Sequence, residues 1–178
     1  MRSVNKTNPC EVRRLQLTDV PALLEIIKSA RAEYGLAARV PALLEPTDYR
    51  LLDYYRRKRS AYFVARVAGE VAGGAGIYPL INGDWTACEL QRMHLRSAYR
   101  GSGIGQALLN ACLQTARELG FEHCYTETIC EMSPAIRFYE RNGFARCSRP
   151  DADAGHAHND CWLMLELRGR DQRHLRLN

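Results

Sequence analysis

The feature that most constrains the fold is a glycine-rich turn between a strand pattern and a helix pattern. The segment Tyr99-Arg100-Gly101-Ser102-Gly103-Ile104-Gly105-Gln106 contains three glycines in five residues. Glycines at such a junction let backbone N–H groups gather at a helix N-terminus, where the helix dipole favours an anion. The turn therefore indicates a phosphate-binding site, although a tight turn that only needs positive φ would also use glycine here.

The residue sequence of this turn excludes two common phosphate-binding motifs. It lacks the G-K-[ST] of a Walker A loop, and its glycines do not have the G-x-G-x-x-G spacing of a dinucleotide fold. The strand before the turn is also expected to pair antiparallel with its neighbour in a hairpin, unlike the first strand of a Rossmann unit.

The rest of the chain alternates strand and helix patterns, which predicts a mixed α/β domain. Ala68-Gly69 and Asn82-Gly83 are hairpin signals that join the second, third and fourth strands into an antiparallel meander. Ser133 is expected to cap the last helix. We expect strands over residues 10–17, 62–67, 70–78, 85–95, 123–129, 144–147 and 160–167, and helices over about 20–32, 47–59, 103–119 and 133–141.

The length of 178 residues predicts a single domain over residues 1–178, with residues 1–9 and 169–178 as flexible tails. Apolar residues make up 46% and charged residues 25%, as in ordinary globular proteins. No apolar run approaches the roughly 18 residues of a membrane span, and no secretory signal is recognisable. We therefore expect a soluble, cytoplasmic protein without a membrane partner.

Charge and cysteine content exclude further classes. The net charge of +5 suits an anionic cofactor, but solvated helix faces and a frayed terminus explain the arginine clusters better. No basic stripe is interleaved with exposed aromatic residues, so no nucleic-acid partner is expected. The seven cysteines form no C-x-x-C pair, and His156 and His158 lie in a polar loop pattern, so neither a disulfide framework nor a metal site is expected.

Two blocks of sequence together make the chain similar to the GNAT acetyltransferase superfamily. Arg100-Gly101-Ser102-Gly103-Ile104-Gly105 matches the [Q/R]-x-x-G-x-[G/A] loop that binds the pyrophosphate of acetyl-CoA in that family. Downstream, the segment from Ala135 to Phe144 reads A-x-x-F-Y-x-x-x-G-F, as in the family's second block. The resemblance covers nearly the whole chain.

The resemblance implies the acyl-CoA N-acyltransferase fold, a mixed and mostly antiparallel sheet of six or seven strands flanked by about four helices. This sheet splays open between its fourth and fifth strands, and acetyl-CoA lies in the gap. Backbone groups of residues 93–95 would bind the pantetheine, whereas Ser133 stands where many relatives carry Asn. The residues assigned to the cofactor are Met93, His94, Leu95, Arg100, Gly101, Ser102, Gly103, Ile104, Gly105, Gln106, Ser133 and Phe138.

The activity implied by the resemblance is direct transfer of the acetyl group from acetyl-CoA to a primary amine of a small molecule or a protein. No metal is required. The alternative is a noncatalytic acyl-CoA-binding or regulatory module that kept the glycine loop. A homodimer is left open by the sequence.

Acetyl transfer to an amine requires a neutral amine, a stabilised oxyanion and a proton for the departing thiolate. For the base, Glu89 lies eleven residues before Arg100, an offset at which several relatives place a catalytic Glu. Strand alternation predicts that Glu89 shares a face with Gln91 and Met93. Glu127 and a water relay are alternatives, and a solvent-facing or arginine-paired Glu89 is the structural interpretation.

For the acid, relatives often place a Tyr at the position of Tyr139, with its hydroxyl near the sulfur. The structural interpretation is that this ring only packs over the cofactor or the core, as Ile136 and Phe138 are also expected to do. His94 alternates to the face opposite Met93, which favours a structural or surface histidine over a catalytic one.

The acceptor site in this superfamily is formed by the first helices and the hairpin loops, here roughly residues 27–55 and 81–85. Their polar and aromatic side chains, Glu33, Tyr34, Glu45, Asp48 and Trp85, are compatible with a cationic amine. Small amines, amino acids, antibiotics, protein lysines and protein N-termini all remain open as acceptors.

Overall fold

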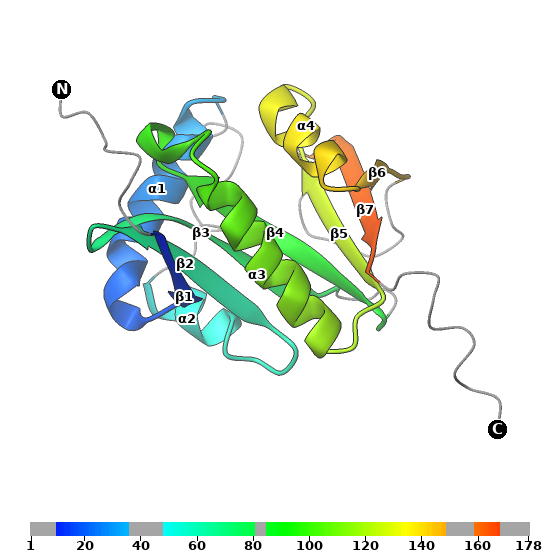
Figure 1. Cartoon of the computed structure of the whole chain (residues 1–178), viewed down its shortest axis with the longest axis horizontal. Helices are drawn as coiled ribbons and strands as arrows, with labels where there is room; N and C mark the ends of the chain where they lie inside the picture. The colour runs from blue at the N-terminus through cyan, green and yellow to red at the C-terminus, as the bar shows by residue number, and fades with distance from the viewer. Residues whose placement is uncertain (1–9, 36–47, 81–84, 149–158, 168–178) are drawn as a thin grey trace.

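A computed structural model describes residues 10–35, 48–80, 85–148 and 159–167, and within them the chain forms one seven-stranded sheet (Figure 1). The strand order is β1-β2-β3-β4-β5-β7-β6. The strands are β1 (Cys10–Arg14), β2 (Ala61–Val67), β3 (Glu70–Pro79), β4 (Ala87–Leu95), β5 (His123–Thr128), β6 (Ala145–Arg146) and β7 (Cys161–Glu166). All seven expected strands are present, but β1 and β6 are shorter than the patterns over residues 10–17 and 144–147 predicted. The turn expected at Asn82-Gly83 lies outside the described residues.

The splay between the fourth and fifth strands is confirmed. All neighbouring strands pair antiparallel except β4 and β5, which are parallel. Their register contains Ala87↔His123, Cys88↔Cys124 and Glu89↔Tyr125 and then stops, although β4 continues to Leu95 and β5 to Thr128. Beyond Glu89, the edge of β4 that faces β5 therefore has backbone groups without a partner in that register.

The helices cover both faces of the sheet. They are α1 (Val20–Ala32), α2 (Asp48–Tyr54), α3 (Ile104–Glu118) and α4 (Ser133–Arg141). Helix α3 crosses one face, and α1 and α2 lie on the other (Figure 1). Ile136 and Tyr139 of α4 share one apolar core with the buried face of α3, so α4 lies on the α3 side. None of the described helices is long and apolar enough to cross a bilayer.

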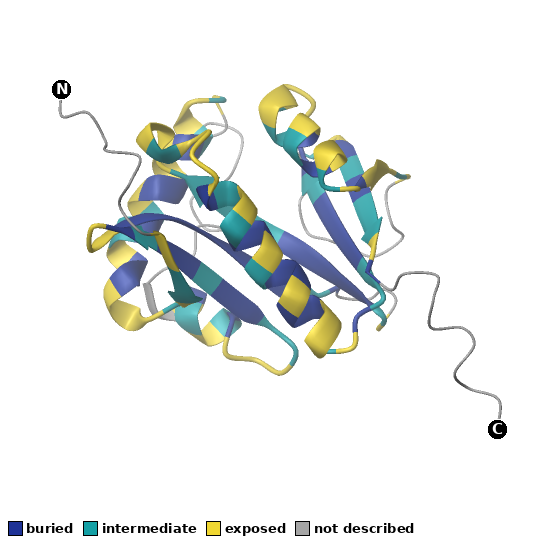
Figure 2. Cartoon of the chain, in the orientation of Figure 1, coloured by how far each residue is buried: buried dark blue, intermediate teal, exposed yellow. Residues whose placement is uncertain are grey.

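Apolar spacing and glycines explain the limits of α3. Ile104, Leu108 and Cys112 are buried on one stripe, while the opposite face is exposed (Figure 2). Gly103, with φ +87°, is the N-cap, and Gly120, with φ +79°, follows the last turn. Ser133 does not cap α4 as expected, because it is already the first helical residue and no side chain caps this helix.

A β-bulge in β4 interrupts the regular alternation of side chains that the sequence predicts. The pairs Gly76↔Gln91 and Gly74↔His94 leave two residues, Arg92 and Met93, opposite one residue of β3. Met93 therefore packs with the α3-side core, whereas Gln91 contacts Tyr55 on the α2 side. The prediction that Glu89 and Gln91 share a face with Met93 is wrong, because the extra residue moves Met93 to the opposite face.

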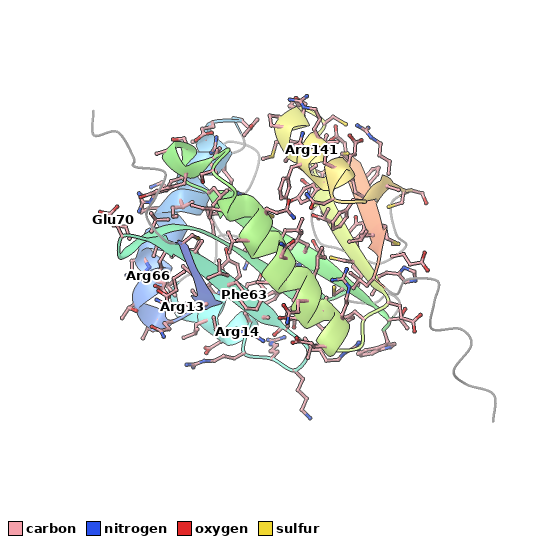
Figure 3. The ribbon with its side chains drawn as sticks, viewed as in Figure 1. Arg13, Arg14, Phe63, Arg66, Glu70 and Arg141 are labelled. Carbon is pink, nitrogen blue, oxygen red and sulfur yellow. The ribbon has the colours of Figure 1, made fainter. Side chains whose placement is uncertain are left out.

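A buried carboxylate joins the first strands to α1. Asp19 is fully buried, and Arg13 donates to it from both guanidinium nitrogens, at 2.6 and 2.9 Å. Arg66 of β2 adds a third contact at 2.7 Å. Figure 3 shows Arg13 and Arg66 side by side on this edge of the sheet, close to α1. All seven cysteines are free thiols, as the sequence predicts.

Candidate active site

A cleft of about 750 Å³ lies where the glycine-rich turn, the end of β4 and α4 come together. It contains both sequence blocks that carry the family resemblance. Its walls are formed by Ala30, Tyr34, Met93, His94, Leu95, Arg100, Gly101, Gly103, Gly105, Gln106, Met132, Pro134, Ala135, Phe138, Tyr139, Arg141 and Asn142. Of the residues assigned to the cofactor, Ser102, Ile104 and Ser133 are not among these walls.

The turn has the geometry that an anion requires. Gly101 and Gly103 have φ of +72° and +87°, and a Cβ at either position would meet no atom within 4 Å. The first bond of α3 is donated by Ala107 N to Gly103 O at 3.1 Å, so the N–H groups of residues 104–106 have no acceptor within the helix. Open space and unused donors therefore coincide at the positive end of the helix dipole.

Gly105 has a packing role. A Cβ there would lie 3.3 Å from Leu95 Cδ1 and 3.6 Å from Met93 Cε. Glycine thus allows the first turn of α3 to lie close against the end of β4. This contact brings the backbone of residues 93–95, which is expected to hold the pantetheine, beside the glycine-rich turn.

The Arg100 side chain is held by Glu33 just after α1. Its two terminal nitrogens donate to the Glu33 carboxylate at 2.6 and 3.0 Å, and this pairing lowers the pKa of Glu33. Glu33 therefore already pairs with Arg100. On the sequence alone, this residue is compatible with binding a cationic acceptor, but its carboxylate is occupied by this arginine. The partners lie 67 residues apart, and neither spacing nor residue type points to the pair.

A second contact joins α3 to α4. Gln106 Nε2 donates to Asn142 Oδ1 at 2.6 Å, and Asn142 Nδ2 donates to the Phe138 carbonyl at 2.9 Å. Phe138 is partly buried, lines the cleft and packs at the edge of the core.

Tyr139 reaches the cleft from α4 and is otherwise buried. Burial raises the pKa of Tyr139 to about 12, while its hydrogen bond with Thr126 acts to lower that pKa. The Thr126 hydroxyl also donates to the Leu90 carbonyl at 3.1 Å, one residue beyond the last β4–β5 register pair. The phenol is therefore protonated at neutral pH and lies where the two strands separate.

Glu89 is buried on the face of β4 that carries α1 and α2, and it is not among the residues that line the cleft. Gln91 Nε2 donates to Glu89 Oε2 at 2.5 Å, and the Tyr55 hydroxyl donates to Gln91 Oε1 at 3.1 Å. These two bonds fix the carboxylate in orientation. Tyr55 directly follows α2 and lies outside both motif blocks, so no motif pointed to this contact.

The rival base Glu127 lies on the same face of the sheet as Glu89. Tyr125 is the register partner of Glu89, and Glu127 follows two residues later. The Tyr125 hydroxyl donates to Glu127 Oε2 at 3.1 Å. Both carboxylates thus border the opening between the strands.

His94 lines the cleft on the α1 side. Burial, together with the positive charges of Arg31, Arg92 and Arg100, lowers the pKa of His94 to about 4. Its imidazole is therefore neutral at physiological pH. This agrees with the interpretation that His94 is not a proton donor in the reaction.

The other residues expected to bind the acceptor do not form one cluster. Tyr34 lines the cleft, and Trp85 is 79% exposed. Glu45 lies outside the described residues, and Asp48 belongs to α2. Within the described chain, the face near Glu89 is instead bordered by two tyrosines that the sequence analysis did not select, Tyr54 and Tyr78, whose rings stack at 4.1 Å.

Comparisons with known proteins agree with this geometry. The family described as "Acetyltransferase (GNAT) family" matches residues 23–144. The chain is 37% identical over 157 residues to the uncharacterized N-acetyltransferase YjgM of Escherichia coli, covering 88% of this chain and 94% of that protein.

Solved structures show the same fold. A GNAT acetyltransferase from Staphylococcus aureus superposes with a TM-score of 0.79 at 20% identity, covering 90% of this chain and all of that one. The PaiA N-acetyltransferase of Thermoplasma acidophilum, in complex with coenzyme A, gives a TM-score of 0.69 at 18% identity, with 89% and 99% covered. The chain therefore belongs to the GNAT acetyltransferase family, whose members are acetyl-CoA-dependent N-acetyltransferases.

Proposed function

We propose that the chain transfers the acetyl group of acetyl-CoA directly to a primary amine. The observation that carries this proposal is the coincidence, in one cleft, of an open glycine-rich helix start with a buried phenol at the splay. Acetyl-CoA binding is supported by the family and by the coenzyme A complex of the PaiA neighbour.

The residues present fit the cofactor. The open space at Gly101 and Gly103, with the unused N–H groups of residues 104–106, would receive the pyrophosphate. Backbone groups on the free edge of β4 would hold the pantetheine arm and the carbonyl to be attacked. When bound, acetyl-CoA supplies an activated thioester.

Glu89 is proposed to accept the proton of the acceptor amine, directly or through a water molecule. It is buried, so its carboxylate acts in surroundings of low dielectric, and Gln91 fixes its orientation. Glu127 provides a second carboxylate on the same face, and a water relay is the third alternative.

Tyr139 is proposed to protonate the departing thiolate. Its raised pKa keeps the phenol protonated before the transfer. In the structure Thr126 donates its one hydroxyl proton to the Leu90 carbonyl. Turned toward Tyr139 instead, this proton would stabilise the phenolate left behind and so reduce the unfavourable difference in acidity between a phenol and a thiol.

The test is release of free thiol from acetyl-CoA by the purified chain across a panel of amines, with acetyl-CoA binding measured by calorimetry. We expect binding without acceptor and thiol release with at least one class of primary amine. Binding without turnover of any amine would favour the noncatalytic module, and absence of binding would overturn both functions.

A further inference from the structure

The β-bulge in β4 gives Arg92 an unusual position. Arg92 has φ +49°, a backbone conformation that is uncommon outside glycine. The Tyr62 hydroxyl donates to the Arg92 carbonyl at 2.9 Å and fixes this conformation. Regular alternation would turn the residue after Gln91 toward α3, but the bulge places Arg92 on the side of α2, where its guanidinium carbon lies 5.4 Å from the Tyr54 ring centre.

The guanidinium of Arg92 differs from those of other arginines, because no anionic group of the described residues pairs with it. Arg13 and Arg66 bind Asp19, Arg100 binds Glu33, and Arg146 binds Glu140. Among the residues that the structure describes, Arg92 makes no ion pair and its guanidinium donates no hydrogen bond, although it is partly buried. Its five N–H donors are therefore available to a ligand.

The surroundings place this charge beside the proposed base. The Tyr54 ring, which Arg92 faces, stacks on the ring of Tyr78, and Tyr78 is the register partner of Glu89. In agreement with this geometry, Glu89 and Arg92 act in opposite directions on the pKa of Tyr54. Arg92 also acts on His94, which lines the cofactor cleft. Arg92 itself is not among the residues that line that cleft, which argues against a phosphate of the cofactor as its partner.

We propose that Arg92 binds a carboxylate of the acceptor, so that the acceptor is an amino acid or a similar small molecule carrying an amine and a carboxylate. This inference rests on the proposed acetyl transfer. A guanidinium forms two parallel hydrogen bonds with a carboxylate, and the Tyr54 ring beneath it restricts its orientation. The amine of the same molecule then lies toward Glu89, which accepts its proton.

The experiment compares each amino acid with the amine that lacks its carboxylate, for example phenylalanine with phenethylamine and alanine with ethylamine. The readout is the ratio of kcat/KM for the two acceptors, by thiol release, in the wild-type chain and in Arg92→Gln. We expect the wild type to favour the amino acid, and Arg92→Gln to reduce the ratio roughly 10- to 100-fold. Because the ratio is compared between enzymes, the different basicity of the two acceptors cancels.

Arg92→Lys keeps the charge without the planar fork, and we expect it to retain part of the preference. Arg146→Gln is the matched control: this arginine already binds Glu140, and its loss should leave the ratio at the wild-type value. Thermal unfolding and acetyl-CoA affinity report whether each variant is folded. If Arg92→Gln does not fold, the ratio in Arg92→Lys and the preference of the wild type decide.

The outcomes separate this inference from the proposed function. Thiol release with equal kcat/KM for amino acids and their decarboxylated amines would overturn the role of Arg92 while leaving acetyl transfer intact. A wild-type preference for a peptide N-terminus, whose carboxylate lies many residues away, would overturn it as well. Absence of thiol release with every amine would instead remove the proposed function.

Discussion

Tyr139 is the residue at which one substitution separates packing from chemistry. Tyr139→Phe keeps the ring in the core and removes the only proton that the side chain can transfer. We expect kcat to fall roughly 10²-fold or more, with the calorimetric Kd for acetyl-CoA nearly unchanged, because the lost interaction exists mainly in the transition state. A wild-type kcat in the folded variant would exclude Tyr139 as the acid.

Thr126 supplies the control for that prediction. Thr126→Val keeps the shape of the side chain and removes the hydroxyl that contacts both Tyr139 and Leu90. If this hydroxyl stabilises the phenolate, kcat should fall about tenfold in the wild-type background and change little in the Tyr139→Phe background. Equal losses in both backgrounds would mean that Thr126 only holds the strands at the splay.

Glu89 can be tested against a matched carboxylate on the same face. Glu89→Gln should lower kcat at neutral pH roughly 10²- to 10⁴-fold and recover partly as pH rises, because more of the acceptor is then the free amine. Glu127→Gln keeps the size and position of the rival and should have a much smaller effect. If Glu127→Gln lowered kcat more than Glu89→Gln did, Glu127 would be the base. If both substitutions lowered kcat only slightly, a water relay would be favoured.

At the scale of single residues, the sequence predicted what the motif blocks contain and little of what surrounds them. Tyr139, Phe138 and the glycines could be located because the blocks carry them on predictable elements. Thr126 could not be given a role, because its hydrogen bond joins β5 to β4 at a register that the sequence does not encode locally. Gln91 could not either, because it contacts Tyr55, which lies 36 residues earlier in the chain.

At the scale of elements, the role of the glycine at the start of α3 can be tested by substitution, with the glycine that follows the end of α3 as the control. Gly103 and Gly120 both have positive φ, and a Cβ at either would meet no atom within 4 Å. Valine at either position should therefore cost a similar strain, of about 1–2 kcal/mol. Only Gly103→Val should weaken acetyl-CoA binding, because its side chain occupies the space proposed for the pyrophosphate.

Calorimetry with acetyl-CoA and urea unfolding of both variants check this prediction. Unchanged affinity in a folded Gly103→Val protein would contradict the assignment of the loop. If Gly120→Val lost as much affinity as Gly103→Val, the loss would reflect strain in α3 rather than the anion site.

The helices and strands themselves were predictable because apolar periodicity and turn residues are local signals. The bulge in β4 was not, since Gln91, Arg92 and Met93 include neither glycine nor proline to mark it. What holds the bulge is the Tyr62 hydroxyl, from a strand 30 residues earlier. One such residue was enough to invert the predicted face of Met93 and to hide the position of Arg92.

At the scale of the whole molecule, the topology followed from the family resemblance, but long-range polar contacts decide how the layers are joined. Glu33–Arg100 connects the end of α1 to the glycine-rich turn, and Gln106–Asn142 connects α3 to the end of α4. Neither pair has a signature in spacing or composition. The sequence therefore predicts which layers exist, whereas the contacts that fix the cleft between them require the structure.

The Asp19 cluster yields the prediction for the stability of the fold. Burial alone would raise the pKa of Asp19, but hydrogen bonds from Arg13, the Gln16 N–H and Arg66 hold it below its usual value. A carboxyl whose pKa is lower in the folded state contributes stability that is present above the unfolded pKa of about 4 and is lost as pH falls through the folded pKa. Asp19→Asn should therefore reduce the free energy of unfolding at pH 7 by roughly 2–3 kcal/mol.

The same linkage predicts that the difference in free energy of unfolding between wild type and Asp19→Asn narrows below about pH 4. There the unfolded carboxyl takes up a proton first, and the narrowing continues until pH falls through the lower folded pKa. Urea unfolding across this range measures it. Asp53→Asn is the control, because Asp53 is exposed, lies 3.9 Å from Arg56 and should change stability little at any pH. If the difference in free energy of unfolding stayed constant down to acid pH, Asp19 would stabilise the fold through packing and not through its charged contacts between β1, β2 and the start of α1.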